Sequence, residues 1–142
     1  MDFMAVKYLH ILGFMSLFAC MVAEHLLLAP RLSRAELNRL VRIDAVLGLS
    51  ALVTLTAGLL LVFAVGKPGG YYLKNGYFHL KATLFVLAAL ISLYPTLTLL
   101  RARRQAGNDI ILPGGLIWAL RLELLLVLPL PLLGMVLAYG YG

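Results

Sequence analysis

The sequence predicts an all-α integral membrane protein, a bundle of four transmembrane helices, and three observations lead to this fold class. Hydrophobic residues make up 63% of the 142 residues and charged residues only 13%, a balance that soluble domains do not show. The mean hydropathy is +0.98. Two uncharged apolar runs, 45–65 and 82–100, are each long enough to cross a hydrocarbon core of about 30 Å.

The four helices are expected at about residues 5–29, 36–65, 77–101 and 114–139. The first and the last are as long as the other two but carry charges, so they are predicted to be spans with polar interiors. The connections are too short to hold a soluble domain. Residues 1–142 are therefore expected to form a single four-helix transmembrane domain.

Local signals predict where several helices end or bend. Pro30 ends the first helix, because the residue before a proline disfavours helical backbone. Ser33 followed by Glu36 has the spacing of a capping box and opens the second helix. Pro129 and Pro131 remove backbone hydrogen bonds near the middle of the fourth helix and should bend it.

The net charge of +6 is explained by topology rather than by binding to nucleic acid, which is not expected. Seven arginines lie in or next to the two connections that join helix one to two and helix three to four: Arg31, Arg34, Arg39, Arg42, Arg101, Arg103 and Arg104. The middle loop carries only Lys67 and Lys74. The excess of positive charge predicts cytoplasmic arginine loops, with both termini and the middle loop outside, in the periplasm. The lipid bilayer is the expected environment of this multi-pass chain.

The first helix organises the polar residues of the protein. It carries His10 near one end and Glu24 with His25 near the other, and polar groups in hydrocarbon cost several kcal/mol unless they find partners. Other helices should therefore supply those partners. Small residues recur at every third position near one side, namely Gly13, Ser16 and Ala19, and allow a neighbouring helix to approach closely.

Sorted by depth, one set of ionisable residues forms an inner polar layer: Glu24, His25, Arg42, Asp44, Arg121 and Glu123. Its three acids and two arginines can nearly neutralise one another, so a structural network of ion pairs is the expected role. The alternative is that Glu24, Asp44 and Glu123 bind and move protons or cations.

The outer polar layer holds His10, His79 and Lys81 without an acid at the same depth. Imidazoles on facing helices are the usual axial ligands of a haem in a helical bundle, and nearby cations pair with its propionates. The pattern therefore suggests a haem, with His10 and His79 as iron ligands and Lys81 near the propionates. The alternative is that the two histidines have a structural role. His79 and Lys81 lie ~200° apart on a regular helix, so only one of them can face His10 squarely.

Three tyrosines of the outer loop, Tyr71, Tyr72 and Tyr77, are typical of an aromatic belt at the membrane surface. The alternative is a lid over an outward-facing pocket. In that arrangement Tyr72 would contact the cofactor.

Several segments resemble a known family: KYLHILGF, VAEHLLL, RIDAVLGLSALV, GKPGGYYLKN, FHLKATLF and SLYPT. Over about residues 6–104 the chain is similar to a bacterial family of small four-helix membrane proteins described only as a domain of unknown function. More distantly, it resembles the HemJ-type protoporphyrinogen oxidases and the membrane domain of CopD-type copper-resistance proteins. This implies a location in the bacterial inner membrane.

The likeness to HemJ-type proteins rests on Lys7 with His10, on the Pro-Arg-Leu of residues 30–32, and on His79 with Lys81. It implies haem b held by His10, with either His79 or Lys81 opposite, and oxidation of a porphyrinogen or a related reduced substrate. This chain departs from the HemJ-type pattern at two places. The two adjacent arginines that HemJ-type proteins have before helix two are replaced by the separated Arg39 and Arg42, and the histidine that those proteins have later in helix three is absent.

The outer polar layer and the resemblance together predict a haem-b-binding inner-membrane redox protein that oxidises a membrane-accessible substrate such as a quinol or a porphyrinogen. In this prediction His10 and His79 are the axial ligands, and Lys81 and Lys67 lie near the propionates. The sequence leaves open whether it is a haem-dependent oxidoreductase. The alternative is a non-catalytic small transporter, channel or assembly subunit whose polar layers are structural. Its small-residue helix faces also suit a homodimer contact.

Overall fold

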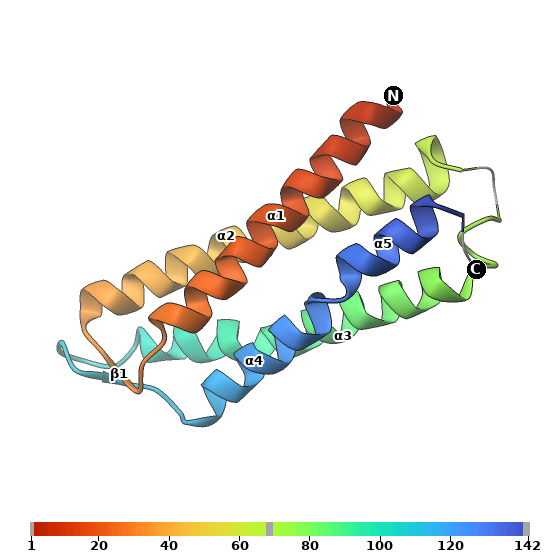
Figure 1. Ribbon diagram of the computed structural model, residues 1–142. Coiled ribbons are helices and arrows are strands. Elements are labelled where there is room, and N and C mark those ends of the chain that lie inside the picture. Colours follow the sequence, from red (N-terminus) through yellow and green to blue (C-terminus); the bar gives the residue numbers. More distant parts are fainter. Residues whose placement is uncertain (1, 68–69, 141–142) are drawn as a thin grey trace.

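The computed structural model describes residues 2–67 and 70–140, and it confirms the predicted all-α membrane bundle (Figure 1). The helices are α1 (Phe3–Leu27), α2 (Arg34–Leu60), α3 (Gly76–Ala102), α4 (Gly115–Val127) and α5 (Leu130–Ala138), and α2 continues into a π-helical turn, η1 (Leu61–Val65). Within the described ranges, four segments are long and apolar enough to cross a membrane, and α4 with α5 forms the fourth of them.

The helices associate as two pairs. α1 packs along α2, whereas α3 packs against α4 and α5, and contacts between α1 and α4 join the pairs. Figure 1 shows that α1 begins and α5 ends at the same end of the bundle, close to η1 and the start of α3. We call this the terminal end. The opposite end carries the two arginine-rich connections.

Local sequence signals explain how two helices begin and where the fourth span breaks. The Ser33 hydroxyl accepts a hydrogen bond from the Glu36 backbone at 3.2 Å, and the Glu36 carboxylate accepts one from the Ser33 backbone at 2.9 Å, which confirms the capping box. Asn75 caps α3 by accepting from the Tyr77 backbone at 2.9 Å. The fourth span is interrupted at Pro129, between α4 and α5, as predicted.

The two arginine-rich connections pair with each other, a feature that the sequence analysis did not predict. β1 (Arg31–Leu32) and β2 (Ile110–Ile111) form a two-stranded antiparallel ribbon, with Leu32 opposite Ile110. We call this end of the bundle the ribbon end. Alternation along β2 buries Ile110 completely and leaves Ile111 55% exposed.

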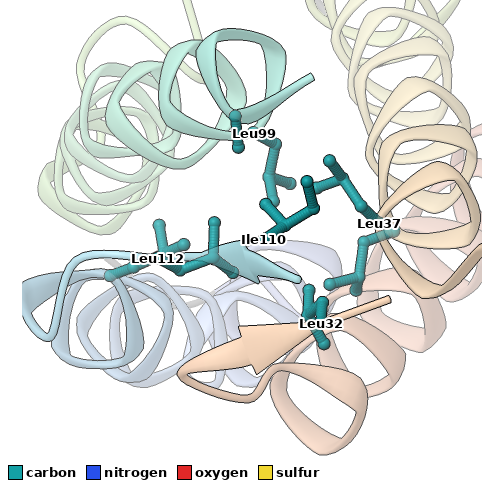
Figure 2. Close-up of a cluster of buried hydrophobic side chains, with 8 residues drawn as sticks. Leu32, Leu37, Leu99, Ile110 and Leu112 are labelled. Atoms are coloured by element: carbon teal, nitrogen blue, oxygen red, sulfur yellow. The ribbon is translucent and has the colours of Figure 1, made fainter. Parts of the chain in front are cut away.

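Ile110 belongs to a leucine-rich core that fills the space between the ribbon and the helix ends (Figure 2). Its buried members are Leu32, Leu37, Leu40, Leu99, Ala102, Ile110, Leu112 and Leu116. A second core lies farther along the bundle and consists of Leu17, Met21, Leu47, Ala88, Val127 and Leu130. The two cores hold all four spans at fixed rotations, which decides which polar side chains face inward.

The outside of the helices is strongly apolar. Large side chains such as Leu49, Leu52, Leu90 and Leu125 are each about 60% exposed. Exposed apolar area of this extent is unusual for a soluble monomer. It is the surface expected of helices that face lipid acyl chains.

Candidate functional site

His10 has a specific anchor on the neighbouring helix. Its Nδ1 atom lies 2.8 Å from the backbone carbonyl oxygen of Thr54 on α2. A carbonyl oxygen only accepts hydrogen bonds, so Nδ1 carries the hydrogen and the Nε2 atom keeps its lone pair in the neutral ring. Gly58 provides the room for this ring, because a Cβ at that position would lie 3.1 Å from His10 Cε1.

Lys81 approaches His10 from the other pair of helices. Its ammonium lies within electrostatic reach of the His10 ring. It also lies against Gly134 of α5, where an added Cβ would be 3.3 Å from Nζ. No hydrogen bond or ion pair involves Lys81 in the described part of the chain. α1, α3 and α5 therefore bring together an imidazole nitrogen with a lone pair and an ammonium without a counter-ion.

His79 is placed differently from His10. Its side chain is exposed, and its Nε2 atom lies 2.6 Å from the carbonyl oxygen of Leu73, in the segment before α3. Over residues 2–67 and 70–140, no hydrogen bond or ring contact joins His79 to His10. The role of His79 as an iron ligand thus stays a prediction, and it would require Nδ1 or a break in the bond to Leu73.

The other predicted cofactor contacts gather at the terminal end. Lys67 places Nζ 5.2 Å from the centre of the Tyr71 ring, and the Tyr71 hydroxyl donates to the Leu137 carbonyl of α5 at 2.8 Å. Tyr72 packs edge-on against Tyr71, with 5.1 Å between ring centres. These contacts tie the middle loop to α5. Residues 68–69 of this loop lie outside the described residues.

A line of polar side chains continues from His10 along the contact between α1 and α2. The Thr54 hydroxyl donates to the Ser50 carbonyl at 2.7 Å, and the hydroxyls of Ser50 and Ser16 are 2.7 Å apart. Gly13 lies in the same contact, so two of the three small residues predicted to face a neighbouring helix do so, while Ala19 is exposed. Cys20 follows Ser16 by about one helical turn, and Glu24 follows Cys20 by another.

Three acids from three helices meet at that depth. Glu24 of α1, Asp44 of α2 and Glu123 of α4 are only 1%, 9% and 1% exposed. The Glu24 carboxyl lies within reach of both other acids, and Asp44 also acts on Glu123. Thr96 of α3 donates its hydroxyl to Asp44 at 2.7 Å. We call Glu24, Asp44 and Glu123 the carboxyl cluster, and every span contributes to it or to its hydrogen bonds.

The prediction that ion pairs connect the inner polar layer is wrong. Arg42 and Arg121 are both exposed, and the Arg121 guanidinium lies 4.7 Å from the Trp118 ring centre instead of near an acid. In the described ranges, the one ion pair joins Arg31 to Asp109 at the ribbon end, at 3.4 Å.

The physical reason is the helix period. Arg42 precedes Asp44 by two residues, and Arg121 precedes Glu123 by two, which separates each pair by ~200° around the helix. When the acid of each pair faces the bundle, the arginine must point outward. This spacing is visible in the sequence and was the available signal for the correct arrangement.

Several atoms of the cluster and its neighbour lack hydrogen-bond partners within the described part of the chain. They are both carboxyl oxygens of Glu24, the Oε1 atom of Glu123 and the Nδ1 atom of His25, all buried. The described residues include no group of three or more His, Cys, Asp or Glu side chains arranged to hold a metal ion. The cluster is therefore a set of buried acids with neither a cation nor full hydrogen bonding.

Comparison with known protein families shows the family of this chain. A family model with the description "Predicted membrane protein (DUF2214)" matches residues 3–142. No curated protein and no solved structure matches the chain. This match confirms the predicted resemblance to a family of membrane proteins without a described activity.

Proposed function

The chain belongs to the DUF2214 family of predicted membrane proteins, and from this premise we propose that it is a haem-b-binding redox protein of the bacterial inner membrane. The main observation that supports this proposal is the orientation of the His10 ring. With Nδ1 anchored to the Thr54 carbonyl at 2.8 Å, the Nε2 atom is the nitrogen left to bind iron.

This arrangement is the one that metal-binding histidines commonly use. Such a histidine donates its second ring N–H to a backbone carbonyl or a carboxylate, which fixes the ring and its tautomer. The ring of His10 is held in this manner by α2, and Gly58 leaves the space that the ring occupies. The donor is thus oriented before any ligand arrives.

Two residues of α3 are candidates for the second axial position. The nearness of Lys81 to His10 supports Lys81, which would have to bind as a neutral amine. His79 is supported by the usual preference for two imidazoles, although its Nε2 atom is engaged with Leu73. Lys67 would pair with the haem propionates, and Lys81 would do so as well when His79 is the second ligand.

A bound haem would supply one-electron transfer at a potential set by its axial ligands and surroundings. The residues of this chain would hold and orient it, through His10 and the Thr54 carbonyl, and would balance its carboxylates with lysine charge. The apolar outer surface of the helices would admit a membrane-dissolved reductant, such as a quinol or a porphyrinogen, from the lipid. The proposal places the termini in the periplasm and the ribbon end in the cytoplasm, following the arginine-rich loops.

The first test is an absorption spectrum of the full-length protein in mild detergent, produced with an adequate haem supply, before and after dithionite. We expect a Soret band and sharpened α and β bands on reduction. His10→Ala should lose the haem. His25→Ala is the matched control, because it removes a histidine of the same helix at the opposite depth, and it should keep the full haem content.

A haem complement that survives in His10→Ala would overturn the ligand assignment. A wild-type spectrum without a Soret band, even after addition of haemin, would overturn the redox function and favour a non-catalytic membrane subunit. Lys81→Ala and His79→Ala then identify the second ligand, because loss of that ligand converts a low-spin spectrum to a high-spin one. A low-spin spectrum retained in both variants would exclude α3 as its source.

A further inference from the structure

We propose that Glu24, Asp44 and Glu123 form a proton-binding site inside the membrane bundle, in which the carboxyl groups hold exchangeable protons at neutral pH. This inference goes beyond the redox proposal and does not depend on haem. It rests on the burial of the three acids, on their mutual approach and on the absence of a compensating cation among the described residues.

The approach of the acids comes from the packing of three helices. α1 lies along α2 and contacts α4, so Glu24 and Glu123 are brought to Asp44 from two sides. α3 supplies the Thr96 hydroxyl, which donates to one oxygen of Asp44 at 2.7 Å. Asp44 thus has a donor that stabilises its charged form, whereas both carboxyl oxygens of Glu24 and the Oε1 atom of Glu123 have no donor among the described residues.

The groups around the cluster do not neutralise it. On α1, Cys20 lies one turn before Glu24, and His25 follows it with a buried Nδ1 atom that makes no hydrogen bond to the described residues. Arg42 and Arg121, on α2 and α4, point outward, as described above. Among the described residues, the two arginines are thus turned away from the cluster, and His25 forms no ion pair with an acid.

Three carboxylates at this site cannot all be charged at an acceptable free energy. Isolated charges in a low-dielectric interior are so unfavourable that such groups are neutralised, and neighbouring carboxylates repel one another unless they share a proton. Protonation also converts a carboxylate oxygen into a donor, which lets Glu24 donate to Asp44. A bound proton thus removes both the excess negative charge and part of the missing hydrogen bonding.

Protons fit the site better than metal ions do. The acids are not arranged as a group of three ligands around a common point, and a calcium or magnesium ion needs six or more oxygen ligands. A surface hollow lined by Asn38, Val41, Arg42 and Arg103 opens at the ribbon end, beside the part of α2 that leads up to Asp44. Val41 precedes Asp44 by about one helical turn.

Infrared spectroscopy of the full-length protein in detergent tests the proposal. At neutral pH we expect a carbonyl stretching band of protonated carboxylic acid that shifts in D₂O. Glu24→Gln, which keeps the shape of the protonated side chain, should lower the area of this band by roughly half, because the Thr96 hydroxyl stabilises the charged form of Asp44 and the band then comes from the two glutamates. Glu123→Gln should have a similar effect and serves as the second variant should Glu24→Gln fail to fold.

Glu36→Gln and Asp109→Asn are the matched controls. They change one exposed glutamate and one exposed aspartate, and both should leave the band unchanged. A wild-type protein without the band at neutral pH would overturn the proposal, and so would a band that is as strong in Glu24→Gln and in Glu123→Gln as in the wild type. A band that disappears when choline is replaced by sodium would overturn it too, because the site would then bind a metal cation.

Discussion

Gly13 of α1 lies directly against Thr54 of α2: a Cβ atom added to Gly13 would be 2.7 Å from Thr54 Oγ1 and 3.2 Å from the Thr54 backbone nitrogen. This close approach brings α1 near enough for His10, one turn earlier, to reach the Thr54 carbonyl. Helix packing through a small residue thus sets the geometry of the candidate haem ligand.

Enlarging Gly13 should therefore destabilise the contact between α1 and α2. We expect Gly13→Ala to lower the free energy of unfolding by about 1–3 kcal/mol, the usual cost of overpacking. Gly48→Ala is the control, because nothing lies within 4 Å of a Cβ at that position, and it should be neutral or slightly stabilising. Thermal unfolding in detergent, measured by circular dichroism, compares the two. Equal Tm values would contradict the packing argument.

The ribbon end should depend on Ile110 far more than on its neighbour in the sequence. Ile110→Ala removes a fully buried side chain and should cost about 2–5 kcal/mol. Ile111→Ala changes the same residue type on the exposed face of β2 and should cost less than 1 kcal/mol. Denaturant titration of both variants measures the difference, and a similar loss in both would show that the two connections are not paired as described.

Arg34 should be needed to hold the third connection against the first. Its guanidinium donates to the carbonyl oxygens of Arg103, Gln105 and Gly107. Arg34→Lys should lose about 1–2 kcal/mol of stability, because an ammonium does not reproduce the planar set of donors. Arg39→Lys is the matched control at an exposed arginine. Limited proteolysis of residues 103–109 offers a second measurement, with faster cleavage expected in Arg34→Lys alone.

The bond from Thr96 to Asp44 should contribute measurably to stability. Thr96→Val removes the hydroxyl that donates to the Asp44 carboxylate at 2.7 Å, which should cost about 1–3 kcal/mol because the acceptor is buried. Thr56→Val, at an exposed threonine of α2, should have little effect. In an Asp44→Ala background the cost of Thr96→Val should largely vanish. Equal costs in both backgrounds would assign the effect to packing rather than to the hydrogen bond.

Much of the fold follows from local sequence. The four spans come from apolar runs of bilayer length, the start of α2 from the Ser33 and Glu36 pair, and the break between α4 and α5 from Pro129. These features could be predicted because each depends on residues within one or two turns of one another. The polar residues that would need partners could also be recognised from the sequence, because an unpaired polar side chain in the hydrocarbon core costs free energy whatever the rotation of its helix.

The partners of those polar residues were decided by tertiary structure. Helix rotation gives His10 the carbonyl of Thr54, keeps His79 at the exposed start of α3, and turns Arg42 away from Asp44. The ribbon joins Leu32 to Ile110 across most of the chain, and no local pattern marks so short a pairing. The sequence by itself determined which segments are long and apolar enough to cross a membrane and where along each of them the charged residues lie. Only packing fixed the rotation of each helix about its axis, because that rotation minimises the free energy of all helix contacts at once.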